Sequence, residues 1–329
     1  MQGTGRASIF IQALRDFVDG RETRYCSPMT SSKWERLRTE AANPATKDID
    51  TLPTDEIVQL MTSDVRDAFD AVQRVHDVIT RGVDVLVDTL HSNGRIVLVG
   101  AGTSGRLGVL EAAEMPPTFG VQPRTIVGIM AGGRSAVHRA KEGVEDDRAA
   151  GDRALARLRL TKNDVVIGVS ASGVTPFVRG ALARARRAGA HAMGITCSPD
   201  SGMRALVDLL VELNVGPEVI AGSTRLKAGT ATKIALNLLT TSAMIRTGKT
   251  YGNLMVDVQA NSEKLRDRGT RIVSAITGLG RRESLTLLRR AKWNVKTAIV
   301  MHKRRLTYGD AKTRLRASGD SIRRALVED

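Results

Sequence analysis

The stretch that decides the fold is GRIVLVGAGTSG, at residues 94–105. Its first seven residues form a short β-branched apolar run that ends in glycine, which is typical of a buried β-strand. The remaining residues are glycines and hydroxyl side chains, and they lead into a helix-favouring stretch over residues 106–114. We therefore predict a strand, a glycine turn and a helix, with Pro116 and Pro117 ending the helix.

The same pattern recurs along the chain. Apolar runs that favour strands follow at residues 124–130, 164–169, 191–197 and 206–215. After the run at 164–169, Thr175 is suited to an N-cap and Pro176 to the first position of a helix over residues 177–189. Strands that alternate with helices predict an α/β protein, a three-layer αβα fold with a parallel sheet. In such folds ligands bind at the carboxyl ends of the strands.

Helical patterns flank this α/β region on both sides. Apolar residues recur at steps of three and four over residues 55–91, and the chain becomes mainly helical again beyond Gly222. Two glycine-containing breaks are expected, at 278–280 and 307–309. We predict four regions: an extension at 1–34, an N-terminal helical region at 35–85, an α/β domain at 86–249 and a C-terminal helical module at 250–329.

The charge balance favours anionic partners. The chain has 50 Lys and Arg against 35 Asp and Glu, a net charge of +15. Only 3% of residues are aromatic, which does not favour a surface that stacks single-stranded nucleic acid bases. Much of the excess lies in residues 281–329, where a solvated, Arg-rich helical surface is the favoured interpretation over a nucleic-acid site.

Neither a metal site nor a membrane span is indicated. Cys26 and Cys197 lie far apart without a C-x-x-C spacing, and the five histidines are scattered. No stretch reaches the roughly 18 consecutive apolar residues of a spanning helix. Acidic residues stand where a signal peptide would be apolar, namely Asp16, Asp19 and Glu22. These observations predict a cytoplasmic protein.

The first glycine loop suggests phosphate binding. Residues 100–105 match G-x-G-x-x-G, but the acidic residue that a dinucleotide fold places after the next strand is missing, since that strand leads into residues 130–133. Thr103 and Ser104 instead offer hydroxyl groups beside the backbone N–H groups of a helix N-terminus, an arrangement that holds a phosphate monoester.

Two further loops repeat this chemistry. Ser170, Ser172 and Thr175 precede the helix at 177–189, and residues 222–233 place hydroxyl groups and a lysine before another helix. For a single loop, a turn that merely caps a helix is an equal interpretation. Three such loops together favour anion binding.

Longer motifs carry a resemblance to a known family. They are GAGTSGRLG at 100–108, EMPPTFG at 114–120, AGG at 131–133 with EGVED at 142–146, SASGVTP at 170–176 and YGNLMVD at 251–257. Over about residues 38–329 the chain resembles the N-acetylmuramic acid 6-phosphate etherases, which have the sugar isomerase (SIS) fold and are similar to the animal glucokinase regulatory protein. The resemblance implies cleavage of the C3 lactyl ether of a phosphorylated amino sugar, without a cofactor, during cell-wall sugar recycling.

The resemblance also assigns residues. It implies that Glu114 protonates the departing lactate and that Glu145 removes the C2 proton. Read without the family, Glu114 is a solvated helix residue and Glu145 belongs to an acidic helix surface. The substrate-binding prediction comprises Gly102, Thr103, Ser104, Ser170, Ser172, Thr175, Ser223 and Lys227.

The spacing of the two helix residues Ser104 and Glu114 is a difficulty. Ten helical residues span about 15 Å, which is long for one sugar. We therefore expect a shorter or bent helix, or a site near the interface of a homodimer, with Glu114 facing the partner's sugar.

Several positions depart from the family pattern, among them Ala42, Val174 and the pair Ser63-Asp64, which stands where Asn with acidic residues is usual. Ala42 stands where an arginine is often found, and Val174 where a basic residue is common. The alternatives are a sugar-phosphate-sensing regulatory protein of the same fold without turnover, and a sugar-phosphate isomerase.

Overall fold

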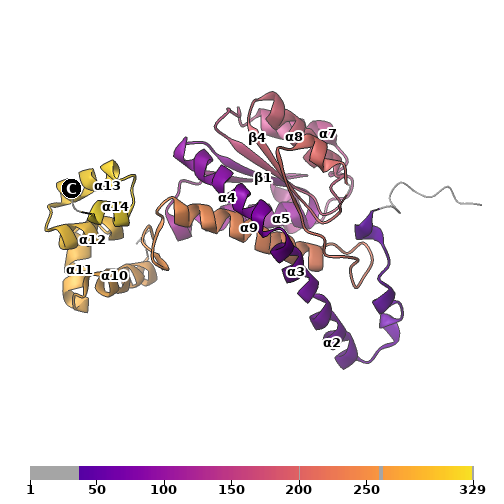
Figure 1. The fold of residues 1–329 in the computed structure, drawn as a ribbon, viewed down its shortest axis with the longest axis horizontal. Helices are drawn as coiled ribbons and strands as arrows, with labels where there is room; N and C mark the ends of the chain where they lie inside the picture. The colour runs from indigo at the N-terminus through magenta and orange to yellow at the C-terminus, as the bar shows by residue number, and fades with distance from the viewer. Residues whose placement is uncertain (1–36, 200, 259–261, 328–329) are drawn as a thin grey trace, which may run out of the picture. The chain divides into compact units, whose positions relative to one another are not determined.

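A five-stranded parallel sheet forms the centre of the fold (Figure 1). The computed structural model describes residues 37–199, 201–258 and 262–327, so the predicted 1–34 extension lies outside the described residues. The strand order is β2-β1-β3-β4-β5, and every neighbouring pair is parallel, as predicted. The strands are β1 (Ile96–Gly100), β2 (Ile126–Met130), β3 (Val165–Val169), β4 (His191–Thr196) and β5 (Leu209–Glu212).

The register aligns the carboxyl ends of three strands on the same side of the sheet. Gly100 at the end of β1 pairs with Met130 of β2 and with Val169 of β3. The loops that leave these three strands therefore start from the same line. These are the loops in which the sequence places its glycine and hydroxyl motifs.

Helices cover both faces of the sheet and make three layers (Figure 1). Ile96 and Leu98 of β1 belong to the core under one face, whereas Val97 and Val99 belong to the core under the other. This alternation of completely buried residues is what a central parallel strand requires. On the first face lie α3 (Arg66–Arg74), α4 (His76–His91), α5 (Gly102–Phe119) and α9 (Lys227–Arg246); on the second lie α7 (Arg148–Ala156) and α8 (Pro176–Arg187).

Shorter elements precede and interrupt the α/β region. They are the 3₁₀ turns η1 (Arg38–Glu40), η2 (Pro44–Thr46), η3 (Ile49–Thr51) and η4 (Met203–Leu206), and the helices α2 (Thr54–Asp64) and α6 (Arg134–His138).

The C-terminal part has a hydrophobic core of its own, which includes Val273, Leu288 and Ile299. It is built by the hairpin β6 (Thr250–Tyr251) and β7 (Leu254–Met255) and by α10 (Glu263–Thr277), α11 (Arg281–Arg290), α12 (Val295–Arg304), α13 (Tyr308–Ala317) and α14 (Ile322–Leu326). The breaks expected at 278–280 and 307–309 fall between helices or at a helix start.

Helix α5 is longer than predicted. Pro116 and Pro117 lie inside it, and it ends only at Gly120, which adopts a left-handed conformation with φ of 66°. Proline removes its own N–H from a helix but keeps its carbonyl, and the Pro116 carbonyl accepts a hydrogen bond from the Gly120 amide at 3.0 Å. The expectation that the prolines end the helix was therefore wrong.

Candidate functional site

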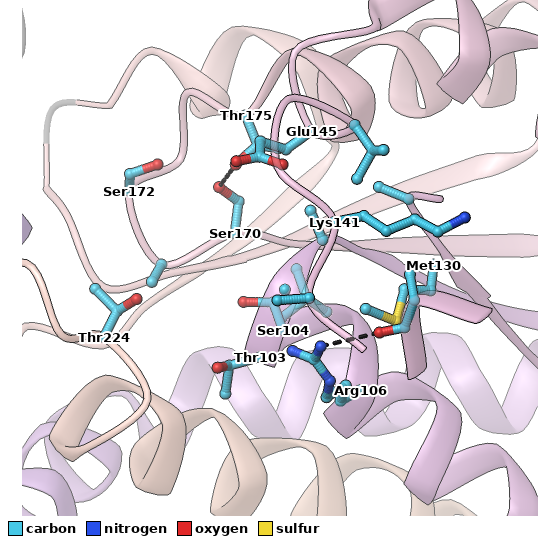
Figure 2. Close-up of a pocket in the computed structure, with 18 of the residues that line it drawn as sticks. Thr103, Ser104, Arg106, Met130, Lys141, Glu145, Ser170, Ser172, Thr175 and Thr224 are labelled. Carbon is cyan, nitrogen blue, oxygen red and sulfur yellow. Dashed lines mark hydrogen bonds between the residues drawn. The ribbon is translucent and has the colours of Figure 1, made fainter. Parts of the chain in front are cut away.

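A cavity of about 270 Å³ lies at the carboxyl ends of β1, β2 and β3. Ala101, Met130 and Ser170, which end these strands or directly follow them, contribute to its wall. Its lining includes seven of the predicted site residues: Gly102, Thr103, Ser104, Glu145, Ser170, Ser172 and Thr175 (Figure 2). These residues are up to 73 positions apart in the sequence, and the topology of the sheet brings them together.

The turn between β1 and α5 brings the helix N-terminus to the cavity. A Cβ atom on Gly100 would lie 2.6 Å from the Gly105 amide nitrogen, so only glycine allows the strand end and the first helical turn to approach this closely. The N-cap residue, Ala101, makes no side-chain capping hydrogen bond. The amides of the first turn thus face the cavity without a protein cap, beside the hydroxyl groups of Thr103 and Ser104.

The loop after β3 is held by its own hydroxyl groups. Ser170 Oγ lies 2.7 Å from Thr175 Oγ1 and accepts a hydrogen bond from the Gly173 amide at 3.0 Å (Figure 2). Thr175 occupies the N-cap position of α8 and Pro176 its first position, as predicted, but the Thr175 side chain makes no capping bond because it pairs with Ser170. The loop therefore presents ordered hydroxyl groups, Ser172 among them, to the cavity.

Glu145 contributes a carboxyl group beside these hydroxyls. It belongs to the loop between α6 and α7, and its backbone carbonyl accepts a hydrogen bond from the Phe177 amide at 2.9 Å. Figure 2 shows Glu145, the Ser170–Thr175 pair and Ser104 around the same cavity. Because α8 holds the main chain of Glu145 beside the cavity, its carboxylate can act as a base on a molecule whose phosphate is held by the two loops.

Two cations also line the cavity. The Arg106 guanidinium donates to the carbonyls of Val137 and Ala136 at 3.0 and 2.9 Å, so it fastens the end of α6. Lys141 Nζ makes only a long contact of 3.5 Å with the Gly132 carbonyl and is exposed. The Lys141 ammonium group is thus better able than Arg106 to bind an incoming anion.

Three further lining residues were not among the predicted site residues. Thr39 and Glu40 come from η1, which is held to the loop before α9 by a hydrogen bond from the Gly222 amide to the Thr39 carbonyl at 3.1 Å. Thr224 comes from that same loop. Thr39 and Glu40 fall at the start of the stretch that resembles the family, about residues 38–329, and no local pattern marks them as a site.

The third predicted anion loop does not present its helix N-terminus to the cavity. The buried Glu218 carboxylate accepts hydrogen bonds from the amides of Lys227 and Ala228, both at 2.9 Å, and so occupies the N-terminus of α9. Ser223 does not line the cavity, although its neighbour Thr224 does.

Lys227 is engaged elsewhere as well. Its ammonium group lies 2.7 Å from Asp64 Oδ1 and 3.1 Å from Asp67 Oδ2, and its side chain is only 3% exposed. Burial alone would lower the pKa of Lys227, but the hydrogen bonds to the two carboxylates raise it above its ordinary range. In this chain Lys227 therefore ties α9 to α2 and α3 and does not line the cavity, contrary to the expectation that it surrounds the phosphate.

Glu114 lies outside the cavity. Helix α5 runs without a break from Gly102 through Glu114, so the part of the first explanation that expected a shorter helix was wrong. Glu114 is exposed, at about 15 Å along the helix from Ser104. Glu111, one turn earlier, is buried and accepts hydrogen bonds from Asn237 and Thr240 of α9.

The described residues contain neither a candidate metal cluster nor a candidate membrane span. Among residues 37–199, 201–258 and 262–327, no three His, Cys, Asp or Glu side chains are grouped so that they could hold a metal ion. Within those same ranges, no helix has the length and apolar character to cross a membrane.

Comparison with known proteins agrees with this geometry. Residues 77–186 match the glucokinase regulatory protein N-terminal SIS domain, and residues 144–242 match the SIS domain. An N-acetylmuramic acid 6-phosphate etherase of Rhodopirellula baltica is 49% identical over 267 residues, which cover 81% of this chain and 88% of that protein. The etherase of Geobacillus thermodenitrificans is 47% identical over 292 residues, 89% of this chain and 99% of that protein.

The chain belongs to the N-acetylmuramic acid 6-phosphate etherase family. The parallel sheet with helices on both faces is the SIS fold of this family. Among solved structures, a phosphoheptose isomerase from Francisella tularensis is similar with a TM-score of 0.45 and 13% identity, over 58% of this chain and 97% of that one. Within the etherase family, the cavity described above is the candidate active site.

Proposed function

We propose that this protein cleaves the C3 lactyl ether of N-acetylmuramic acid 6-phosphate and releases N-acetylglucosamine 6-phosphate and D-lactate. The observation that carries the proposal is one cavity that combines an uncapped helix N-terminus, two hydroxyl-rich loops and the Glu145 carboxylate. The identity of 47–49% to etherases over most of their length supports this choice of substrate.

In the proposed complex the sugar 6-phosphate binds at the start of α5. The first-turn amides and the hydroxyl groups of Ser104 and Thr103 are suited to a dianion, and Ser170, Ser172 and Thr175 complete the cradle from the loop after β3. Gly102 belongs to the same turn and lets the backbone adopt φ of 52°. Binding at the phosphate would hold the open-chain sugar with its C2 carbon toward Glu145.

The proposed reaction is an elimination followed by hydration. Glu145 removes the C2 proton, which is acidic because C2 is adjacent to the C1 aldehyde of the open-chain sugar. The electrons of that C–H bond form the C2–C3 double bond, the C3–O bond breaks, and Glu114 protonates the departing lactate oxygen. Water then adds its hydroxyl to C3 while a proton returns to C2. This sequence uses only an acid and a base and consumes one water.

We further propose that Glu114 is supplied by a second copy of the chain. Apolar side chains are exposed on its helix and on the helix that packs against it: Leu110, one turn earlier on α5, is 49% exposed, and Leu238 of α9 is 40% exposed. Contact with a second copy would cover them. Mixing Glu114→Gln with Glu145→Gln subunits would then restore activity, whereas a site within one chain would leave the mixture inactive.

Lys141 is our candidate for the residue that binds the carboxylate of the lactyl group. The substrate carries a second anion besides the phosphate, and Ala42 removes a cation that the family pattern often has. Lys141 lines the cavity with its ammonium group only weakly engaged. A charge-assisted contact from Lys141 would bind the carboxylate before cleavage.

The test is an assay for D-lactate after incubation of the purified protein with N-acetylmuramic acid 6-phosphate. The proposal predicts D-lactate and N-acetylglucosamine 6-phosphate in equal amounts. A sugar-phosphate isomerase would instead convert a phosphorylated aldose to a ketose without lactate. A sensing protein would bind the sugar phosphate and leave it unchanged.

A further inference from the structure

A second cavity, of about 540 Å³, lies along the edge strand of the sheet. Its wall includes Gly128, Ile129 and Met130 of β2, together with residues of α5, α6 and α7 and Phe177 of α8. None of the residues that the sequence predicts for the sugar phosphate lines it. Its volume falls within the range of about 300–1,000 Å³ that is typical of small-molecule sites.

The lining combines apolar side chains with cations. Val109, Ile129, Val137 and Phe177 are apolar, whereas three arginines, Arg134, Arg153 and Arg157, are the charged residues, and no carboxylate lines the cavity.

Two of the arginines are available to a ligand. Arg153 pairs with Asp147 at 3.1 Å, but Arg134 and Arg157 make no ion pair with any residue in the described part of the chain. Guanidinium groups beside an apolar wall are suited to an anion that carries an apolar body, since the anion pairs with the guanidinium and the body is removed from water.

The second cavity also shares its wall with the candidate active site. Met130 lines both cavities. The Gly132 carbonyl is the partner of Lys141, and the Phe177 amide holds the Glu145 carbonyl, while Gly132 and Phe177 line the second cavity. An occupant would therefore contact the segments that position Lys141 and Glu145.

We propose that this cavity binds a small organic anion, a carboxylate, sulfonate or phosphate on an aromatic or acyl body, at a site separate from the sugar-phosphate cavity. Arg134 and Arg157 bind the anionic group, and Phe177, Ile129 and Val137 contact the body. The proposal does not depend on the reaction that the first cavity performs.

The probe is 8-anilinonaphthalene-1-sulfonate, whose fluorescence reports binding of an aromatic sulfonate to the purified full chain. We expect the double variant Arg134→Gln/Arg157→Gln to raise its dissociation constant at least about tenfold, because two charge-assisted contacts are lost. Arg282→Gln, an exposed arginine of α11, is the matched control and is expected to leave the dissociation constant within about twofold.

A third variant locates the probe. Ser172→Ala alters the first cavity only, so it is expected to leave sulfonate binding unchanged. Equal binding by wild type and the double variant would overturn the proposal, because the probe would then sit on apolar surface elsewhere. Weakening by Ser172→Ala to the same extent as by the double variant would also overturn it, because the probe would then occupy the first cavity.

Discussion

Replacing Lys227 by methionine separates two roles for this residue, a structural tie and a phosphate ligand. The variant keeps the apolar stem and removes the charge, leaving Asp64 without its partner at 2.7 Å. Loss of one partner of a buried pair costs about 3–5 kcal/mol. We expect the lower end, about 3 kcal/mol, because the Asp64 side chain retains 13% exposure and the pair with the 56% exposed Asp67 contributes little.

Thermal unfolding and sugar-phosphate binding are the two assays. At roughly 2 °C per kcal/mol for a protein of this size, the midpoint of unfolding is expected to fall by about 6 °C. The dissociation constant for N-acetylglucosamine 6-phosphate is expected to stay within about twofold, since Lys227 does not line the cavity. Lys233→Met, an exposed lysine on the same helix, is the control and should change neither quantity.

The reasoning would be refuted by the opposite pattern. An unchanged unfolding midpoint together with a dissociation constant raised more than about tenfold would mean that the Lys227 ammonium group binds phosphate. A double variant that also carries Asp64→Asn should recover part of the lost stability, because it removes the unpaired buried carboxylate. No recovery would show that the ion pair is not the source of the effect.

Three other predictions concern stability, reactivity and specificity. Burial would raise the pKa of Asp164, but hydrogen bonds from the Arg95 guanidinium and from the Thr161 and Arg95 amides lower it, so its stabilisation is present above its ordinary pKa and is lost as the pH falls below about 4. Asp164→Asn should therefore reduce the acid loss of unfolding free energy, measured by urea titration at several pH values, and an unchanged pH dependence would contradict this. Burial raises the pKa of the Cys197 thiol to about 12. In a Cys26→Ser variant, a disulfide reagent should therefore modify no thiol until the protein unfolds. Rapid labelling of the native variant would disprove this. Lys141→Met should raise KM for the lactyl sugar about tenfold and leave the affinity for N-acetylglucosamine 6-phosphate unchanged. An equal loss of affinity for the two sugars would show that Lys141 binds the phosphate.

The strands and the two cavity loops follow from local sequence. A β-branched run ending in glycine, followed by hydroxyl groups and a helix, places Thr103 and Ser104 at a strand end, and parallel pairing brings Ser170 to the same edge. These features depend on neighbouring residues and on a pairing rule. The strands and the two cavity loops could therefore be predicted from the sequence.

The third loop shows where such reasoning fails. Its hydroxyl groups and lysine resemble the other two loops, but its helix N-terminus is occupied by Glu218 and its lysine by Asp64, which lies 163 positions away. Only tertiary structure decides whether a helix N-terminus meets a ligand or a carboxylate of the same chain. The end of α5 likewise differs from the local prediction, because the helix continues through two prolines to Phe119.

Exchange of the sugar's C2 proton with solvent tests the central claim most directly. The protein is incubated in D₂O with N-acetylmuramic acid 6-phosphate, and deuterium at C2 is followed by NMR spectroscopy. If Glu145 is the base, the wild type and Glu114→Gln incorporate deuterium at C2, whereas Glu145→Gln does not. Incorporation by Glu145→Gln at the wild-type rate would contradict the account, because the Glu145 carboxylate would then not be the group that removes the proton.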